Sequence, residues 1–174
     1  MAVSSHAKRK HYFVIALVVV VVDQLTKWLV SSRLALHDSV NVIPGVFRLT
    51  HVQNQGAAFG ILSDSPSEWK LSMLIFFSLF ALVVVSTLLW RNSHSINSTG
   101  IALSLILGGA IGNLWDRMVN GHVTDFFDVY FRGYHWPAFN IADSAIVVGA
   151  LVLMAEILFS KAEAKESSTV HSQT

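Results

Sequence analysis

Four long apolar stretches, separated by polar segments, dominate the chain of 174 residues. A helix of about 20 apolar residues, rising roughly 1.5 Å per residue, crosses a hydrocarbon core of about 30 Å. We therefore expect membrane-spanning helices at residues 12–30, 71–90, 98–117 and 137–159. The pattern predicts an all-α polytopic membrane protein that forms a single integral membrane domain over residues 1–174.

Two of the connecting segments are long enough to fold outside the membrane. Residues 31–70 contain prolines and glycines and a short run, Val46 to Val52, in which apolar and polar residues alternate as in a β-strand. Residues 118–136 form the second segment, on the same side. We therefore expect a small extramembrane, β-containing segment on the outer side of the four spans.

Four spans place both chain ends, residues 1–11 and 160–174, on one side of the membrane. The tails and the link between the second and third spans carry six Lys or Arg residues, against five in or directly beside the two opposite segments: Arg33, Arg48, Lys70, Arg117 and Arg132. Lys8, Arg9 and Lys10 directly precede the first apolar stretch, and basic residues gather on the cytoplasmic side. The charges therefore predict cytoplasmic tails, with both longer segments near the outer leaflet.

Composition agrees with a membrane protein and excludes several other classes. The chain is 53% hydrophobic and 13% charged, with a mean hydropathy of +0.54, which is too apolar for an ordinary soluble domain. A net charge of +1 provides no basic face for phosphates, so no nucleic-acid partner is expected. The absence of cysteine excludes a thiolate nucleophile and a Cys-ligated metal.

Candidate chemistry concentrates between Gly112 and Ser144. Four aspartates occur there next to apolar segments: Asp116, Asp125, Asp128 and Asp143. A carboxylate near the centre of a spanning helix costs about 2.5–3.5 kcal/mol on insertion scales, which favours a functional role for those that are kept.

Other hydrolytic sites have little support in the sequence. The chain contains no HExxH, GxSxG or GxGD pattern, and its one SxxK, Ser67 to Lys70, lacks companion motifs. His51, His122 and His135 share no helical face, so we interpret them as loop histidines. We therefore expect neither a metal site nor an organic cofactor.

A pair of carboxylates remains, and Asp125 with Asp143 fits best. Asp125 follows the third span and Asp143 lies about two turns inside the fourth, so residues 126–138 can return the chain and bring them together. Two close carboxylates share one proton, which allows one to act as a base toward water and the other to polarise a carbonyl. For each of these aspartates, and for Asp128, the alternative is an ordinary helix cap or a loop salt bridge.

Amide and guanidinium side chains accompany this pair. Asn113 and Arg117 are four residues apart and Asn140 and Asp143 three apart, so each pair shares a helical face and lines one cavity. Arg117 either binds a substrate carbonyl or pairs with Asp116.

Two upstream groups are also candidates. Asp23 and Lys27 lie four apart on the first span, either as a neutralising ion pair or as support for the outer loops around the site. Asn54 and Gly56 belong to a stretch rich in small residues that either contacts a peptide or forms a turn before a short helix.

These motifs together resemble the lipoprotein signal peptidases, the type II signal peptidases of bacteria. The pattern GN-x-x-DR-x-x-x-G-x-V-x-DF-x-D followed by N-x-AD is filled from Gly112 to Asp143. Upstream, D-x-x-x-K is filled by Asp23 and Lys27, and N-x-G-x-AF by Asn54, Gly56, Ala58 and Phe59.

The resemblance implies an aspartyl endopeptidase in the bacterial cytoplasmic (inner) membrane. Its substrate would be a prolipoprotein whose cysteine bears a diacylglyceryl group, cut on the amino side of that cysteine. Asp125 and Asp143 would be catalytic, and Asn54, Gly56, Asn113, Arg117 and Asn140 would contact substrate, with support from Asp23, Lys27, Asp116 and Asp128. Membrane lipid and a cyclic peptide inhibitor of the globomycin type are further expected partners.

A different class of function remains open from the residues alone. Asp23, Asp125 and Asp143 could form a proton or cation path through a small four-helix transporter. Such a path needs polar groups through the whole membrane depth, and the second and third spans offer little besides scattered serines.

Overall fold

The computed structural model describes residues 3–56, 67–92 and 96–171. Within these ranges the chain forms four long helices, α1 (Val3–Arg33), α2 (Ser67–Arg91), α3 (Ser98–Asn120) and α4 (Ile141–His171). Ala58 and Phe59, which complete the N-x-G-x-AF pattern, lie outside the described residues.

Each helix contains a stretch that is long and apolar enough to cross a membrane. These stretches are Lys10–Arg33, Trp69–Arg91, Ser98–Asn120 and Ile141–Phe159. The expectation of four spanning helices is therefore confirmed by length and composition. Helices α1 and α4 also continue beyond their apolar stretches, so much of the expected tails is helical.

The start of α4 differs from the expectation. The helix begins at Ile141 rather than near Pro137, because Asn140 caps it: Asn140 Oδ1 accepts a hydrogen bond from the Asp143 backbone N–H at 2.9 Å. In return, Asp143 Oδ2 accepts from the Asn140 backbone N–H at 3.2 Å, which completes a reciprocal capping box. Asp143 therefore lies in the first turn of α4 and not two turns inside it, and it does serve as a helix cap.

A four-stranded antiparallel sheet joins the two polar segments. Its order is β1 (Ser39–Ile43), β2 (Phe47–Asn54), β3 (Val123–Phe131) and β4 (Tyr134–His135). The alternation from Val46 to Val52 correctly predicts β2. The second polar segment, residues 118–136, for which no strand is expected from the sequence, forms β3, however, and pairs with β2, with Val52 opposite Asp125. The protein therefore contains more β-structure than the sequence pattern indicates.

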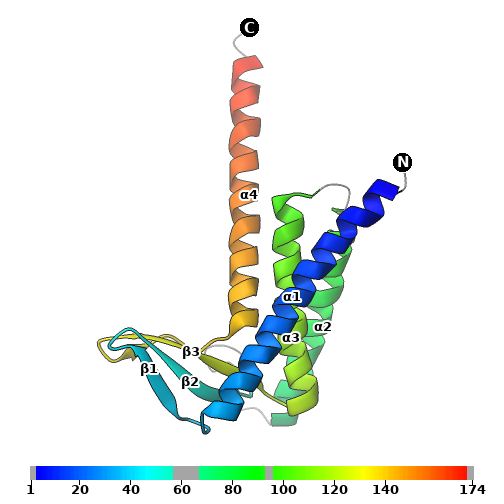
Figure 1. Ribbon diagram of the computed structural model, residues 1–174. Coiled ribbons are helices and arrows are strands. Elements are labelled where there is room, and N and C mark those ends of the chain that lie inside the picture. The colour runs from blue at the N-terminus through cyan, green and yellow to red at the C-terminus, as the bar shows by residue number, and fades with distance from the viewer. Residues whose placement is uncertain (1–2, 57–66, 93–95, 172–174) are drawn as a thin grey trace.

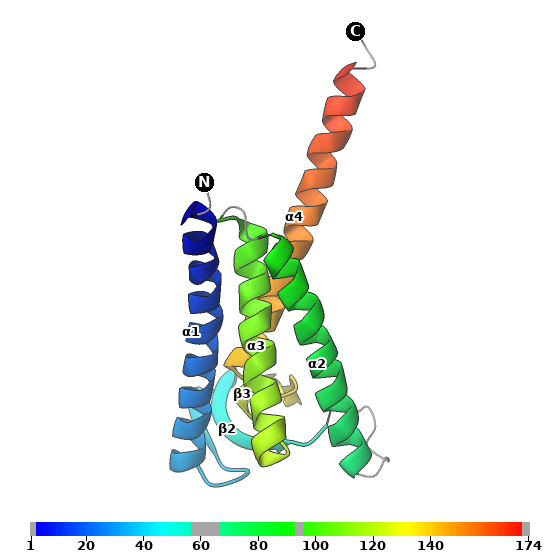
Figure 2. The same cartoon turned by 90° about the vertical axis from the view of Figure 1, so that its right-hand side faces the viewer.

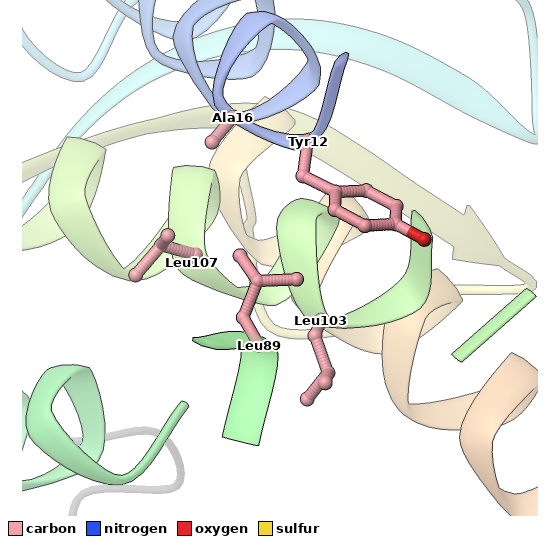
Figure 3. Close-up of a cluster of buried hydrophobic side chains, with 5 residues drawn as sticks. All are labelled: Tyr12, Ala16, Leu89, Leu103 and Leu107. Atoms are coloured by element: carbon pink, nitrogen blue, oxygen red, sulfur yellow. The ribbon is translucent and has the colours of Figure 1, made fainter. Parts of the chain in front are cut away.

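Helix α3 lies at the centre of the bundle and packs against the other three helices (Figure 2). Two glycines allow close approach: a Cβ on Gly108 would lie 2.6 Å from Ala16 O of α1, and one on Gly112 would lie 2.6 Å from Asp23 Oδ2. An apolar cluster of Tyr12, Ala16, Leu89, Leu103 and Leu107 joins α1, α2 and α3 (Figure 3).

The sheet lies at the end of the bundle where α1 and α3 end and α4 begins, opposite both chain termini (Figure 1). The polar residues of the sequence motifs converge at this junction. It therefore contains the candidate site.

Candidate active site

Asp125 lies on β3, and its carboxylate is held by two amide side chains. Asn54 Nδ2, at the end of β2, donates to Asp125 Oδ2 at 3.0 Å, and Asn140 Nδ2 donates to Oδ1 at 2.7 Å. The antiparallel pairing of β2 with β3 brings Asn54 beside Asp125, although 71 residues separate them. Only 2% of Asp125 is exposed.

Asp143 faces the same group of amides from the first turn of α4. Asn113 Nδ2 of α3 donates to Asp143 Oδ1 at 2.7 Å, and the Asn140 backbone N–H donates to Oδ2. Asn140 is fully buried and contacts both carboxylates. Its side chain donates to Asp125 and its backbone N–H donates to Asp143. The structure thus brings together the two aspartates and the three asparagines, Asn54, Asn113 and Asn140, that the sequence singles out.

The environment of Asp125 favours its protonated form. Burial raises the pKa of Asp125 to about 6, and the negative charge of Asp143 adds to this. The hydrogen bonds from Asn54 and Asn140 and the positive charge of Lys27 oppose the shift. Asp125 and Asp143 therefore lie in one site but have different hydrogen-bond partners. Such a difference between paired carboxylates is a condition for acid–base chemistry.

Arg117 lies one helical turn beyond Asn113 on α3 and does not pair with Asp116. Its Nη1 donates to Asn113 O at 3.2 Å, while its buried Nε has no hydrogen-bond partner among the described residues. Asp116 instead forms an ion pair with Lys27, with 2.6 Å between Nζ and Oδ2. The guanidinium interacts electrostatically with Asp143 and Asp125. Because its Nε is unpaired, Arg117 retains a donor for a further ligand.

The supporting residues of α1 form a buried ionic cluster. Lys27 Nζ lies 2.7 Å from Asp23 Oδ2, and Asp23 Oδ1 accepts from the Ala142 backbone N–H at 2.9 Å. Asp23 therefore contacts the start of α4. Sequence reasoning missed Gln24, whose Nε2 donates to Asp116 Oδ1 at 2.9 Å. A polar residue within an apolar span was the signal that could have identified it.

The remaining candidates lie at the edge of this site or away from it. The Gly56 backbone N–H donates to Asn54 Oδ1 at 3.0 Å, which orients the Asn54 amide so that its Nδ2 faces Asp125. Asp128 lies farther along β3 and binds Arg48 Nε at 2.6 Å and His135 Nδ1 at 2.9 Å. Burial alone would raise the pKa of Asp128, but His135 and Arg48 outweigh it and hold the pKa below its usual range.

Two of the expected loop histidines, His51 and His135, lie in strands instead, because their segments join the sheet. His51 is buried in β2, where its Nδ1 lies 2.9 Å from Leu34 O at the end of α1, and His135 contacts Asp128. Within the described part of the chain, no group of three or more His, Asp or Glu side chains is placed to hold a metal ion.

Comparisons with known proteins agree with the motif resemblance. The family model described as signal peptidase (SPase) II matches residues 15–159. A lipoprotein signal peptidase of Solibacter usitatus (strain Ellin6076) is 44% identical over 88% of this chain and 94% of its own length. One of Francisella tularensis subsp. novicida (strain U112) is 41% identical over 86% and 92%.

Two solved structures share the fold. One, described as a bacterial membrane enzyme at 2.3 Å resolution, has a TM-score of 0.79 at 31% identity and covers 88% of this chain and 91% of its own. Another, at 1.9 Å, has a TM-score of 0.76 at 33% identity, with 86% and 93% covered. The suspected family is thereby confirmed: the chain belongs to the signal peptidase II family and is a multi-pass membrane protein.

Proposed function

We propose that this protein is a membrane-embedded aspartyl endopeptidase that removes signal peptides from prolipoproteins. The substrate carries a diacylglyceryl group on a cysteine, and the cut falls on the amino side of that cysteine. Family membership supports the substrate class, since the relatives are named lipoprotein signal peptidases. The single observation that carries the catalytic assignment is the contact of Asn140 with both Asp125 and Asp143 in one buried site.

The two carboxylates divide the chemistry between them. Asp125 carries the shared proton, which its burial favours, and Asp143 is the carboxylate, because the N-terminus of α4 and the Asn113 amide favour an anion there. Asp143 takes a proton from a water molecule while Asp125 donates a hydrogen bond to the scissile carbonyl oxygen. The water oxygen then bonds to the carbonyl carbon, and proton transfer to the amide nitrogen allows the carbon–nitrogen bond to break.

The amides and Arg117 position the substrate. A peptide that leaves water needs partners for its backbone groups, and an unpaired buried group costs about 1–3 kcal/mol. Arg117 offers its unpaired Nε, and Asn54, Asn113 and Asn140 lie around the carboxylates, with Gly56 beside Asn54. A cyclic peptide inhibitor of the globomycin type binds by competing for these same groups.

Family membership and the four apolar helices support a location in the membrane. The enzyme lies in the bacterial cytoplasmic membrane with residues 1–11 and 160–174 in the cytoplasm, the helices as one integral domain, and the sheet and site at the outer leaflet. The substrate helix and its acyl chains reach the site laterally through lipid. Reporter fusions at residue 96 and at the C-terminus should report the cytoplasm, and a fusion near residue 40 the opposite side.

The decisive experiment is cleavage of a lipidated precursor by purified protein in lipid vesicles, with the released peptide identified by mass spectrometry. Wild type should cut on the amino side of the lipidated cysteine, and Asp143→Asn should not cut. Asp38→Asn, an exposed aspartate whose carboxylate accepts from the neighbouring Ser39 N–H, is the matched control and should retain activity. Absence of cleavage by wild type, together with proton or solute flux in the same vesicles, would instead favour a transporter.

A further inference from the structure

We propose that the Asp23–Lys27 pair of α1 positions Asp143 in two ways. Lys27 orients the Asn113 amide, which contacts the Asp143 carboxylate. Asp23 binds the backbone of the helix turn that contains Asp143. The inference rests on the proposed function and assigns to α1 a role beyond mutual neutralisation of two buried charges. Neither residue contacts Asp143 directly in the hydrogen bonds of the structure, so both are positioning residues.

Lys27 determines which atom of Asn113 faces Asp143. Lys27 is 4% exposed and its ammonium group has only donors, so any amide that binds it must present oxygen. Lys27 Nζ donates to Asn113 Oδ1 at 2.9 Å. The other end of the planar amide, Nδ2, therefore points away from Lys27 and donates to Asp143 Oδ1 at 2.7 Å.

Loss of the ammonium would remove this constraint. The Asn113 amide could then turn by half a rotation and place its oxygen against the Asp143 carboxylate, which is repulsive. The other group that holds Asn113 Oδ1 is Asn140 Nδ2, at the longer distance of 3.3 Å. That same nitrogen donates to Asp125 at 2.7 Å, so it is a weak substitute for Lys27.

Asp23 acts on the backbone next to Asp143. The first N–H groups of a helix have no partner within the helix. Asp23 Oδ1 accepts from one of them, the Ala142 N–H, at 2.9 Å, and Asp23 is fully buried. The carboxylate passes across α3 at Gly112, where an added Cβ would lie 2.6 Å from Asp23 Oδ2. An acceptor supplied by α1 thus fixes the residue that precedes Asp143.

The charges around Lys27 keep the ammonium in place. Asp23 and Asp116 flank it at 2.7 and 2.6 Å, and Gln24 occupies the other oxygen of Asp116. In the described part of the chain, Arg117 of α3, Asp125 of β3 and Asp143 itself are further charged groups near this cluster. Among the described residues, Lys27 is the cation that contacts a side-chain amide of the site, whereas Arg117 contacts the Asn113 backbone carbonyl.

A double-mutant cycle on cleavage of the lipidated precursor tests the Lys27 step. Lys27→Met and Asn113→Ala should each lower kcat by about 10- to 100-fold, with KM changed less than about 3-fold. In the Asn113→Ala background, Lys27→Met should cost less than about 3-fold more, because its effect passes through the missing amide. The control cycle pairs Lys27→Met with Asn54→Ala, which has no contact with Lys27, and should be additive.

Two further variants cover the case in which Lys27→Met does not fold. Asn113→Asp keeps an oxygen for Lys27 but replaces the N–H toward Asp143 with a repelling oxygen, so it should lose about 100-fold in kcat while circular dichroism shows that it still folds. Gly112→Ala should displace Asp23 from Ala142 and lower kcat more than KM changes.

The possible outcomes separate the two proposals. Additivity of the Lys27→Met and Asn113→Ala effects, or near-normal kcat in Asn113→Asp, would overturn the positioning role while wild type still cleaves. A wild-type protein that does not cleave would overturn the proposed function itself.

Discussion

The two aspartates of β3 lie three residues apart in opposite surroundings. At the inner end, the Asp125 carboxylate contacts two neutral donors of the described chain, Asn54 and Asn140, and its pKa is raised to about 6. At the outer end, Asp128 contacts Arg48 and His135, which hold its pKa below the usual range. Neutral amides fix the position of a carboxylate and leave its proton exchangeable, whereas cations fix its charge as well.

The surrounding structure agrees with this difference. Asp128 connects β2, β3 and β4 through Arg48 and His135. Arg48 and His135 also flank the Tyr130 ring, so polar contacts hold these three strands together. Asp125 lies where the sheet meets α3 and α4, beside Asp143. Strand β3 therefore supplies Asp128, which stabilises the fold, and Asp125, whose proton remains exchangeable.

The largest expected effect comes from substituting the two positions in the same way. Asp125→Asn should lower the cleavage rate by at least about 1,000-fold, because an amide cannot hold the shared proton. Asp128→Asn should lower it by less than about 5-fold, since Asp128 contacts no group of the site. Initial rates on a lipidated precursor measure both, and the comparison breaks if Asp128→Asn is the inactive variant.

A smaller loss is expected when one neutral donor is removed. Asn54→Ala deletes the 3.0 Å hydrogen bond to Asp125 and should lower kcat/KM by about 10- to 100-fold, because carboxylate and substrate both lose a positioned partner. Gln53→Ala, the exposed neighbour on β2, is the control and should be near wild type. Equal affinity of a globomycin-type peptide for wild type, Asn54→Ala and Arg117→Ala would remove these residues from the substrate site.

The sequence predicts the spans, strand β2 and the site aspartates, but not strand β3. Apolar length gives the four spans because a spanning helix has few other solutions in lipid. The alternation at Val46 to Val52 predicts β2, whereas VTDFFDVYF of β3 has no regular alternation and its pairing depends on a segment 71 residues away. The motifs identify Asp125 and Asp143, yet they do not distinguish a cap from a catalytic group at Asp143, which has the geometry of a cap and faces the site as well.

Contacts between helices are the part that sequence reasoning could not reach. The i,i+4 spacing of Asp23 and Lys27 suggests an ion pair, but it says nothing of Ala142 or Asn113 on other helices. Gln24 shows no helical partner within α1 other than Asp23, and its contact with Asp116 appears only once α1 packs on α3. These contacts depend on tertiary packing at glycines such as Gly112.

The pH dependence of cleavage should reflect the inner aspartate. If Asp125 carries the shared proton, the rate should fall as pH rises through about 6, by roughly 10-fold per pH unit above that value, because the protonated fraction falls in that proportion. The value belongs to the coupled pair. Asp128→Asn should leave this limb of the kcat profile in place. A rate that rises through pH 6 would assign the base role to Asp125 instead.

The smallest effects concern stability, and they should have opposite signs at the two ends of β3. A raised folded-state pKa means that Asp125 destabilises the fold progressively as pH rises from about 4 to about 6. Asp125→Asn removes that penalty and loses one donor contact, so at pH 8 it should increase the free energy of unfolding by about 1–2 kcal/mol. A lowered pKa means that Asp128 stabilises the fold above about pH 4 and loses this effect as pH falls through its folded-state pKa.

Asp128→Asn should accordingly lower the free energy of unfolding by about 1–2 kcal/mol at pH 8, through weaker contacts with Arg48 and His135, and by progressively less toward pH 3. Thermal unfolding of both variants in the same detergent at pH 8 and pH 3 measures the signs, with Asp38→Asn as the control for an exposed aspartate. Because neutral amides leave the Asp125 charge uncompensated, only its substitution should stabilise the protein. Destabilisation of similar size by both substitutions at pH 8 would mean that the Asn54 and Asn140 donors compensate a charge as fully as Arg48 and His135 do.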